Sequence, residues 1–427
     1  MAGITMVTWL GESRFQSLDE PISRVRNLAI IHTLAYFLFL LFFSYLVHLH
    51  PYVKLGPLPE HAGDVVNSSR NDPILIYHSS HTSRNKMKAL LTGISGQDGY
   101  FLSRFLTEKG YEIHGVIRRN SSMSQGTVSL HTKDVRDNIT IHYGDLTDAN
   151  FFSKLLSEEK PDEMYHLAAQ SFVGYSFQNP SSTYDVNISG TLNIANAVKD
   201  YSPGTKLYFA ATSEMFGQPE TTPQNEETAF KPRSPYAVSK LAGFWTMKTY
   251  REAYDLFICN GILFNHESEV RGPEFVTRKI SLGVARIANG SSDPIELGNL
   301  DARKDWGYAG DYVEGMWKML NHETPDDFVL GTGELHTVRE FAQFAFERAG
   351  FRITWKGSGV DEVGISEDGR VLVKVNKAFF RPLESDNYLA DYGKAERELG
   401  WKPRTKFGEL VKIMVDSDLK ESSHSRE

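Results

Sequence analysis

The stretch Lys88–Tyr100, KALLTGISGQDGY, determines how the rest of the chain is interpreted. A short apolar run ends at Thr92, and glycines then recur at every third position, at Gly93, Gly96 and Gly99. In a strand-turn-helix unit such glycines allow a sharp turn, close approach of the backbone to a diphosphate, and tight packing of helix on strand. The free N–H groups at the start of the helix then hold the anion. This spacing alone is a weak signal, so its context has to support it.

Length and composition fit a soluble α/β enzyme. The chain has 427 residues, of which 41% are hydrophobic and 23% are charged, so it can bury a large core. The net charge of -8 shows no excess of basic residues of the kind that binds nucleic acid, so no nucleic-acid partner is predicted. The single cysteine, Cys259, excludes an intrachain disulfide and a cysteine-based zinc cluster, and no metal site is predicted.

Residues 1–87 form an N-terminal extension. Within it Leu28–Val47 has no charged residue and is long enough to span a hydrocarbon core, while residues 48–87 are typical of a linker. The apolar run is too long for a cleaved signal peptide. Two interpretations stay open, a signal anchor that gives membrane contact through 28–47 and an upstream segment joined to a complete soluble enzyme. A signal anchor with Arg24 and Arg26 before it would send the rest of the chain across the membrane, which conflicts with the cytoplasmic location expected for the catalytic part.

From Lys88 onward strand and helix patterns alternate. We expect strands that end at Thr92 and then cover 111–117, 139–143, 164–167, 207–211 and 256–263, with a first helix over 99–109. This alternation predicts an α/β fold with a doubly wound, Rossmann-like parallel sheet that binds ligands at the carboxyl ends of its strands. Residues 88–270 are the expected dinucleotide-binding domain. Residues 271–420, less regular, are expected to be a smaller mixed region that mainly binds substrate, and 421–427 a polar tail.

The end of the second strand indicates which dinucleotide is bound. An acidic residue would bind an NAD ribose there, but the chain has Arg118 and Arg119, followed by Asn120 and Ser121. Guanidinium groups favour a 2′-phosphate, so the predicted cofactor is NADP. Small residues in the stretch 166–171, HLAAQS, close the fourth strand where a dinucleotide could lie against the backbone. The same stretch also fits an ordinary tight turn.

Tyr236 and Lys240, in SPYAVSK, share one face of a helix because they are four residues apart. A tyrosine with a reference pKa of about 10 is a poor base at neutral pH. A nearby ammonium and the positive ring of an oxidised nicotinamide both favour its phenolate. Such a tyrosine can take a hydroxyl proton while hydride leaves the same carbon.

The fifth strand supplies two more polar residues. Thr212 and Glu214 alternate by two, so in extended backbone both point to the same side. The hydroxyl can hydrogen-bond a sugar oxygen that becomes a carbonyl, and the carboxylate can remove a proton from the neighbouring carbon. A carboxylate that caps a helix or forms an ion pair is the alternative for Glu214.

These residues together resemble a known family. From about Lys88 to Val415 the chain is similar to GDP-mannose 4,6-dehydratases of the extended short-chain dehydrogenase group, through TGISGQDGY, VIRRNSS, HYGDLTD, HLAAQS, TSEMFG, RSPYAVSK, NGILFNHES and LGNLDARKDWG in that order. The resemblance implies NADP held throughout turnover, GDP-mannose as substrate and a homo-oligomer, a dimer or tetramer. It implies Thr212, Glu214, Tyr236 and Lys240 as catalytic residues. The implied cofactor-binding residues are Gly93, Ser95, Gly96, Gln97, Asp98, Gly99, Arg118, Arg119, Asn120, Ser121, Asp145, Leu146, Leu167, Ala168, Ala169, Gln170, Ser171, Lys240, His266 and Arg271.

Substrate contacts are expected from basic residues in the region after the sixth strand. Cations after the sixth strand are candidates for the GDP diphosphate: Arg278, Lys279, Arg303, Lys304 and Arg381. The chain departs from the family pattern at four positions, Ser182, Glu269, Val270 and Glu274, which puts the geometry on the substrate side in question.

Two other functions stay open. A nucleotide-sugar 4-epimerase or 4-keto-sugar reductase would share the glycine loop and the Tyr236/Lys240 pair but would not need a base at Glu214. A membrane-tethered nucleotide-binding protein without turnover would fit the Leu28–Val47 run and the altered residues Glu269 and Val270.

Overall fold

The computed structural model describes residues 86–119, 126–380 and 388–424. The apolar run 28–47 lies outside this part of the chain, as do Asn120, Ser121 and Arg381. Within the described ranges, no helix combines the length and the apolar character needed to cross a membrane.

A seven-stranded parallel sheet forms the larger part of the molecule, in the order β11-β6-β5-β4-β1-β2-β3. Its strands are β1 (Lys88–Thr92), β2 (Glu112–Ile117), β3 (Ile139–Tyr143), β4 (Glu163–His166), β5 (Lys206–Thr212), β6 (Ile258–Leu263) and β11 (Asp327–Leu330). The first six agree with the predicted strands to within two residues at either end. The doubly wound fold class is therefore confirmed.

The chain between these strands is mainly helical. It forms α2 (Gln97–Glu108), the short 3₁₀ segment η1 (Gly126–Leu130), α3 (Lys133–Asp137), α4 (Ala149–Glu159), α5 (Val173–Gln178), α6 (Pro180–Tyr184), the π-helical turn η2 (Asp185–Ser189), α7 (Gly190–Tyr201), η3 (Ser213–Phe216) and α8 (Pro235–Tyr254). After β6 come β7 (Asn265–Glu267), α9 (Val276–Ala288), β8 (Ile295–Leu297), β9 (Arg303–Lys304), β10 (Trp306–Tyr308), α10 (Ala309–Leu320), β12 (His336–Thr337), α11 (Val338–Arg348), β13 (Ile353–Lys356), η4 (Gly359–Asp361), β14 (Val363–Ser366), β15 (Val371–Val375), η5 (Lys377–Phe379), α12 (Gly393–Leu399) and α13 (Phe407–His424).

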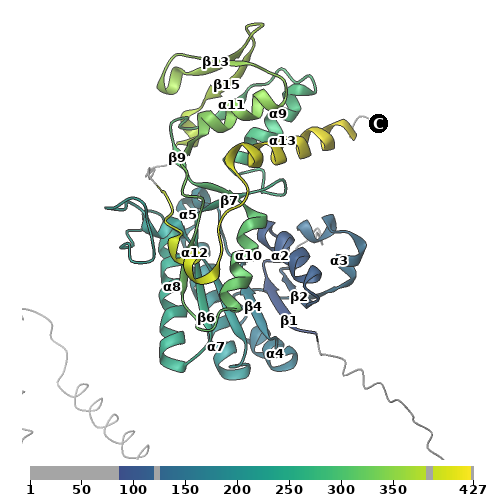
Figure 1. The fold of residues 1–427 in the computed structure, drawn as a ribbon, viewed down its shortest axis with the longest axis vertical. Helices are drawn as coiled ribbons and strands as arrows, with labels where there is room; N and C mark the ends of the chain where they lie inside the picture. The colour runs from purple at the N-terminus through teal and green to yellow at the C-terminus, as the bar shows by residue number, and fades with distance from the viewer. Residues whose placement is uncertain (1–85, 120–125, 381–387, 425–427) are drawn as a thin grey trace, which may run out of the picture. The chain divides into compact units, whose positions relative to one another are not determined.

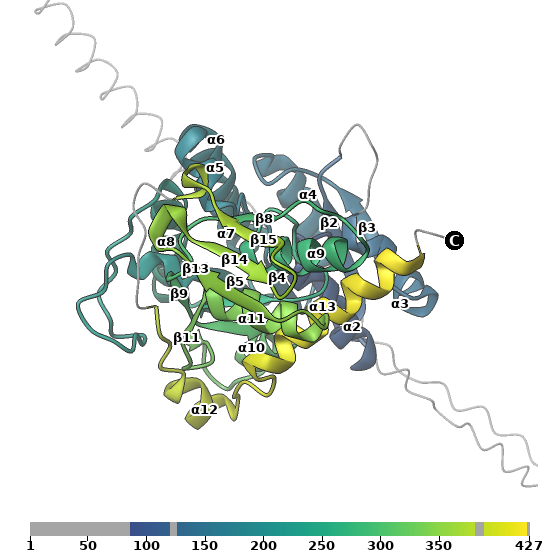
Figure 2. The same cartoon turned by 90° about the horizontal axis from the view of Figure 1, so that it is seen from above.

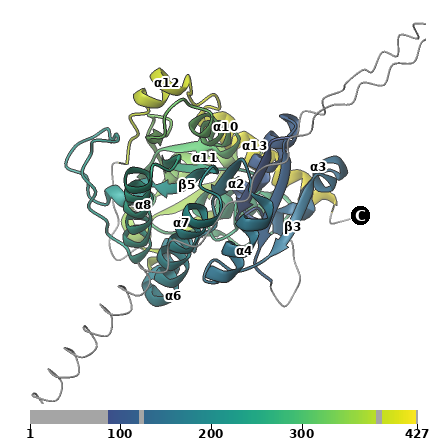
Figure 3. The same ribbon diagram turned by 90° about the horizontal axis from the view of Figure 1, so that it is seen from below.

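Helices cover both faces of the large sheet. The strands have continuous apolar runs, so side chains on both faces have to be buried. The interior strands β4, β5 and β6 are buried along almost their whole length. One core joins the sheet to α2 and α10, and a second joins it to α4, α7 and α8. Figure 3 shows α4 and α7 on the side of the sheet opposite α10 and α12.

A smaller region lies beyond the carboxyl ends of the large sheet (Figure 1). Its four-stranded mixed sheet has the order β13-β14-β15-β8. Side chains of α9, α11 and α13 share a third core with it, and Figure 2 shows these helices beside the small sheet. This is the smaller mixed region that the sequence predicts after residue 271.

The two regions interleave along the chain. After α9 and β8 the chain returns to the large sheet, where α10 packs against α2 and β11 pairs with β6. The large sheet therefore includes a seventh strand and a helix from the range 309–330, which the sequence prediction assigned mainly to substrate binding. All described residues belong to one compact unit.

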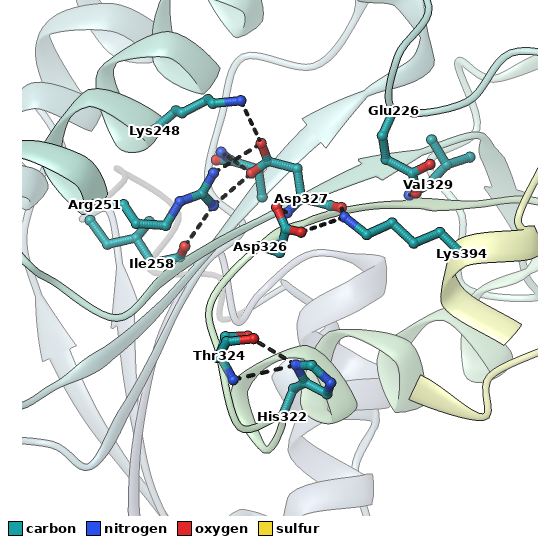
Figure 4. A network of polar contacts seen from close by, with 11 residues as sticks. Glu226, Lys248, Arg251, Ile258, His322, Thr324, Asp326, Asp327, Val329 and Lys394 are labelled. Atoms are coloured by element: carbon teal, nitrogen blue, oxygen red, sulfur yellow. Dashed lines mark hydrogen bonds and ion pairs between the residues drawn. The ribbon is translucent and has the colours of Figure 1, made fainter. Parts of the chain in front are cut away.

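A buried carboxylate fixes α8 to this added strand. Asp327 accepts hydrogen bonds from Arg251 Nη1 at 2.8 Å, Arg251 Nη2 at 3.1 Å and Asn260 Nδ2 at 2.8 Å. Lys248 lies 3.7 Å away, and Lys394 of α12 donates to the neighbouring Asp326 at 2.5 Å (Figure 4). Bidentate arginine–carboxylate pairs have a defined geometry. The carboxyl-terminal half of α8 is thereby held at the edge of the sheet.

Gly217 and Gly110 offer a matched test of close backbone approach. Gly217 ends η3 at φ +59, and a Cβ there would lie 1.5 Å from the Lys231 carbonyl oxygen. Gly110 has φ +82, but a Cβ there would meet nothing within 4 Å. We expect Gly110→Ala to cost about 1 kcal/mol of unfolding free energy and Gly217→Ala clearly more, since it adds a steric overlap to the strain of positive φ. Chemical denaturation of both variants measures the difference, and equal losses would contradict a close contact at Gly217.

Candidate active site

A cavity of about 650 Å³ opens at the carboxyl ends of β1, β2, β4 and β5, where the fold predicts a ligand. Most of the predicted catalytic and cofactor-binding residues line it: Gly93, Ser95, Gly96, Gln97, Asp98, Arg118, Asp145, Leu146, Leu167, Ala168, Ala169, Gln170, Ser171, Thr212, Glu214, Tyr236, Lys240, His266 and Arg271. Gly99 and Arg119 do not line it.

The glycine loop packs closely on the loop after β4 at Gly93 and is open to the cavity at Gly96. Gly93 has φ +76, and a Cβ there would lie 2.7 Å from the Ala168 backbone nitrogen. α2 begins directly after Gly96, so its first N–H groups face the cavity end of the loop. Gly99 has a packing role, since a Cβ at this position would lie 2.4 Å from Ile94 Cα. The loop thus fits the diphosphate of a dinucleotide.

Arg118 follows β2 directly and is exposed at the cavity wall. Asp145, just after β3, also lines the cavity and accepts hydrogen bonds from the Thr147 N–H at 3.0 Å and hydroxyl at 2.8 Å. These hydrogen bonds, with a smaller contribution from Arg118, lower the pKa of Asp145. Among the residues that the structure describes, Arg118 therefore supplies the guanidinium group that can contact a phosphate at this end of the cavity.

Thr212, Glu214 and Tyr236 come together at the end of β5 and the start of α8. Ser234 caps α8 by accepting from the Ala237 N–H at 3.0 Å, and Pro235 occupies the first turn, so Tyr236 begins the helix at the cavity wall. Thr212 accepts from the Glu214 N–H at 3.3 Å. Burial raises the pKa of Tyr236, which is 8% exposed, while a hydrogen bond with Thr212 opposes that shift. The phenol therefore stays protonated until a further positive charge arrives.

Lys240 lies one helical turn after Tyr236 and is also buried. Its Nζ donates to the Ala210 carbonyl oxygen at 2.8 Å. Burial lowers the pKa of Lys240 to about 8. The two residues share one face of α8, as their spacing predicts.

Asn187 positions this part of the site, although sequence reasoning did not identify it. Its Nδ2 donates to Ser239 Oγ at 2.9 Å and to the Gln170 carbonyl at 3.0 Å, and its Oδ1 accepts from the Gln170 N–H at 2.8 Å. It connects the π-helical turn η2, α8 and the loop after β4. No sequence motif marks it, because its partners are 17 and 52 residues away.

Asp98 and His266 form an ion pair across the cavity. His266 Nε2 lies 3.0 Å and 3.1 Å from the two Asp98 oxygens, and its Nδ1 lies 2.8 Å from the Phe264 carbonyl oxygen. Both ring nitrogens face acceptors, which favours the imidazolium. Burial opposes the charged forms, but the pair outweighs it, so the pKa of His266 is raised and that of Asp98 is lowered. The pair ties the start of α2 to β7.

The proposed diphosphate cations lie elsewhere. The structure describes four of the candidates, and none of them lines the cavity: Arg278, Lys279, Arg303 and Lys304. Arg278 is buried in an ion pair with Asp418 of α13, so it would have to leave that partner to meet a diphosphate. The Lys279 ammonium lies 3.4 Å from the centre of the Phe379 ring, and Arg303 is exposed. Lys304 is buried, 5.0 Å from the Tyr388 ring.

Of the four departures from the family pattern, Ser182 alone lines the cavity. Val270 packs against the core formed by the sheet, α2 and α10, and Glu269 faces the Tyr308 hydroxyl at 3.5 Å. Glu274 is exposed. Sequence reasoning also missed Tyr175 and Phe275 as lining residues; Phe275 lies under the Arg271 guanidinium at 3.6 Å.

Solved structures with the same fold bind nicotinamide cofactors of both kinds. RMD from Pseudomonas aeruginosa complexed with NADPH matches this chain with a TM-score of 0.62 at 20% sequence identity. The match includes 79% of this chain and 100% of that one. The dTDP-glucose 4,6-dehydratase of Bacillus anthracis in complex with NAD matches with a TM-score of 0.64 at 20% sequence identity. This match includes 79% of this chain and 98% of that one. At this identity the likeness shows the fold.

Sequence comparison is more specific. The family model described as GDP-mannose 4,6 dehydratase matches residues 90–414. GDP-mannose 4,6 dehydratase of Homo sapiens is 49% identical over 338 residues, which is 78% of this chain and 91% of that protein. GDP-mannose 4,6-dehydratase of Vibrio cholerae is 45% identical over 351 residues, which is 78% of this chain and 94% of that protein. The chain therefore belongs to the GDP-mannose 4,6-dehydratase family.

Proposed function

We propose that this protein is a GDP-mannose 4,6-dehydratase, which converts GDP-mannose to GDP-4-keto-6-deoxymannose with loss of water. The observation that carries the proposal is the meeting of a hydroxyl, a carboxylate and a buried phenol, Thr212, Glu214 and Tyr236, in one cavity with Lys240. Relatives that are 45% and 49% identical to this chain have this name, and the chain matches more than nine tenths of the length of each.

We propose NADP as the cofactor. The glycine loop, which lines the cavity, and the start of α2 would hold its diphosphate, and Arg118 would meet its 2′-phosphate. Fold neighbours contain NAD and NADPH, so the choice rests on Arg118. When bound, the nicotinamide accepts a hydride from the sugar and later returns it.

The first task of the chain's own residues is to remove the proton from the C4 hydroxyl. Thr212 would hydrogen-bond the C4 oxygen and Tyr236 would take its proton as the carbonyl forms. The buried Lys240 ammonium adds positive charge to the cavity, which favours the phenolate that Tyr236 needs. The ketone at C4 makes the proton on C5 acidic.

The second task falls to Glu214. Its carboxylate would take the proton from C5 and pass a proton to the C6 hydroxyl, which leaves as water. C6 then receives the hydride and C5 takes up a proton, for which the Tyr236 phenol holds the one removed from the C4 hydroxyl. C4 is oxidised and C6 is reduced in the same sugar, so the reaction has no net redox change. A 4-epimerase or a 4-keto-sugar reductase has no use for this base, and the presence of Glu214 two residues after Thr212 favours the dehydratase.

The reaction predicts a specific balance of products. Incubation of the full chain with GDP-mannose and a trace of NADP should give one 4-keto-6-deoxy product per GDP-mannose consumed, without net NADPH. Mass spectrometry measures the loss of water, and absorbance measures NADPH. An isomer of unchanged mass would identify an epimerase, and bound NADP without product would identify a binding protein.

Removal of the carboxylate at Glu214 should stop the elimination. We expect Glu214→Gln to lower kcat by about 10²–10⁴-fold with little change in NADP binding, because a positioned general base contributes that much. The control is Glu220→Gln, since Glu220 is an exposed carboxylate paired with Lys231 outside the cavity. Unchanged turnover in Glu214→Gln would exclude Glu214 as the base.

The neighbouring arginines allow a matched test of cofactor choice. Arg118→Ala should weaken NADP binding by at least about tenfold while NAD binding changes little, because a charge-assisted contact to the 2′-phosphate is lost. Arg119→Ala should have a smaller effect, since Arg119 does not line the cavity. Titration of both dinucleotides against intrinsic fluorescence gives the two ratios. Equal losses for NADP and NAD in Arg118→Ala would contradict the assignment.

The roles of the remaining predicted residues, the dimer or tetramer and the cytoplasmic location of the catalytic part stay predictions.

A further inference from the structure

Two histidines and a glutamate meet on the sheet away from the catalytic cavity. His114 comes from β2, His142 from β3 and Glu159 from the last residue of α4. None of the three lines the cavity. Lys88 and Glu112, the first residues of β1 and β2, flank the cluster, which therefore lies toward the amino-terminal side of these strands.

Strand register brings the two rings together. His114 pairs with Thr140, and Val116 pairs with His142, so both histidines point to the same face of the sheet. α4 covers that face, and Figure 3 shows it next to β3. The end of α4 then places the Glu159 carboxylate beside the rings. His114 is 5% exposed, while the carboxylates of Glu159 and Glu112 are 24% and 47% exposed, which leaves the cluster open to solvent on one side.

Hydrogen bonds orient the His114 ring. Its Nε2 lies 2.9 Å from Glu112 Oε1, so the ring donates its proton there. The lone pair on Nδ1 then points to His142 Nε2 at 2.9 Å and lies 3.4 Å from Glu159 Oε2. A histidine whose second nitrogen donates to a carboxylate is the usual arrangement of a metal ligand.

We propose that His114 Nδ1, His142 Nε2 and the Glu159 carboxylate bind one zinc ion, with water as the fourth ligand. Two imidazoles and a carboxylate are a donor set that zinc prefers. Metal–ligand distances of about 2.0–2.1 Å in a tetrahedron require the ligand atoms to be about 3.3 Å apart. The 3.4 Å separation of His114 and Glu159 already meets this, and the two histidine nitrogens have to move apart by about 0.4 Å. All three ligand atoms lie within 4.8 Å of one another, so the Glu159 carboxylate has to turn toward His142 to complete the site.

Lys88 competes for Glu159 but does not prevent binding. Its ammonium donates to Glu159 Oε2 at 2.8 Å and also to the Glu159 main-chain oxygen at 3.1 Å. Lys88 therefore keeps a partner when the carboxylate turns to a metal.

The expected effect is on stability. β3 is an edge strand of the large sheet, and a zinc ion would connect it to β2 and to α4. A ligand that binds only the folded state raises the unfolding temperature. Turnover should be unchanged, because the cluster contributes no residue to the catalytic cavity.

The test uses the full chain without a histidine tag, stripped of metal and titrated with ZnCl₂ against a chromophoric chelator. We expect one zinc per chain and a higher melting temperature with zinc. His142→Gln and Glu159→Gln should each weaken binding at least about tenfold, and Glu112→Ala should weaken it by about 10–100-fold through loss of the oriented tautomer. His322→Gln, which alters a histidine bound to the Thr324 main-chain oxygen, should bind zinc like the unaltered protein.

Three outcomes would overturn the proposal. The first is failure to retain zinc against a chelator of about micromolar affinity. The second is a 1:1 complex that His142→Gln and Glu159→Gln leave unchanged, which would place the metal elsewhere. The third is zinc binding that abolishes turnover, which would place it in the catalytic cavity. Turnover without zinc shows that each variant is folded, because the altered residues lie outside that cavity.

Discussion

The hydrogen bond from the buried Lys240 ammonium to the Ala210 carbonyl oxygen aligns the candidate active site. Ala210 is two residues before Thr212 on β5, and Lys240 is one turn after Tyr236 on α8, so this bond sets the strand end and the helix start against each other. Burial of an ammonium group without a hydrogen-bond partner costs several kcal/mol of folding free energy. Positions of β5 and α8 that break this bond are therefore disfavoured. The bidentate pair of Arg251 and Asp327 fixes the other end of the same helix.

Charge in the cavity is arranged in two places. Asp98 and His266 neutralise each other where the start of α2 meets β7. Glu214, Tyr236 and Lys240 lie where β5 meets α8, and there the pKa of the phenol is raised while that of the lysine is lowered, because both are buried. Each of the two buried groups is therefore pushed toward its neutral form. A positive ligand would change that balance in favour of the phenolate.

Sequence patterns predicted the parts of the fold that depend on local order. Apolar runs gave the first six strands, and glycine spacing with the Tyr236/Lys240 pair indicated two parts of the cavity wall. The family resemblance implied most of the other lining residues. The patterns did not separate Gly99, which packs on Ile94, from the glycines at the cavity, nor identify Arg278 as the partner of Asp418. They also missed β11 and Asn187. Each of these depends on contacts between residues far apart in the chain, which periodicity does not report.

The position of β11 in the chain affects the order in which the protein can fold during synthesis. β6 has no neighbour on its outer side until the ribosome has made the segment up to Leu330, which includes α9 and β8 of the smaller region. An exposed strand edge of this kind attracts other chains. Vectorial folding of the nucleotide-binding sheet therefore cannot finish before part of the smaller region has emerged, and a nascent chain stalled before β11 would expose that edge to aggregation or to chaperones.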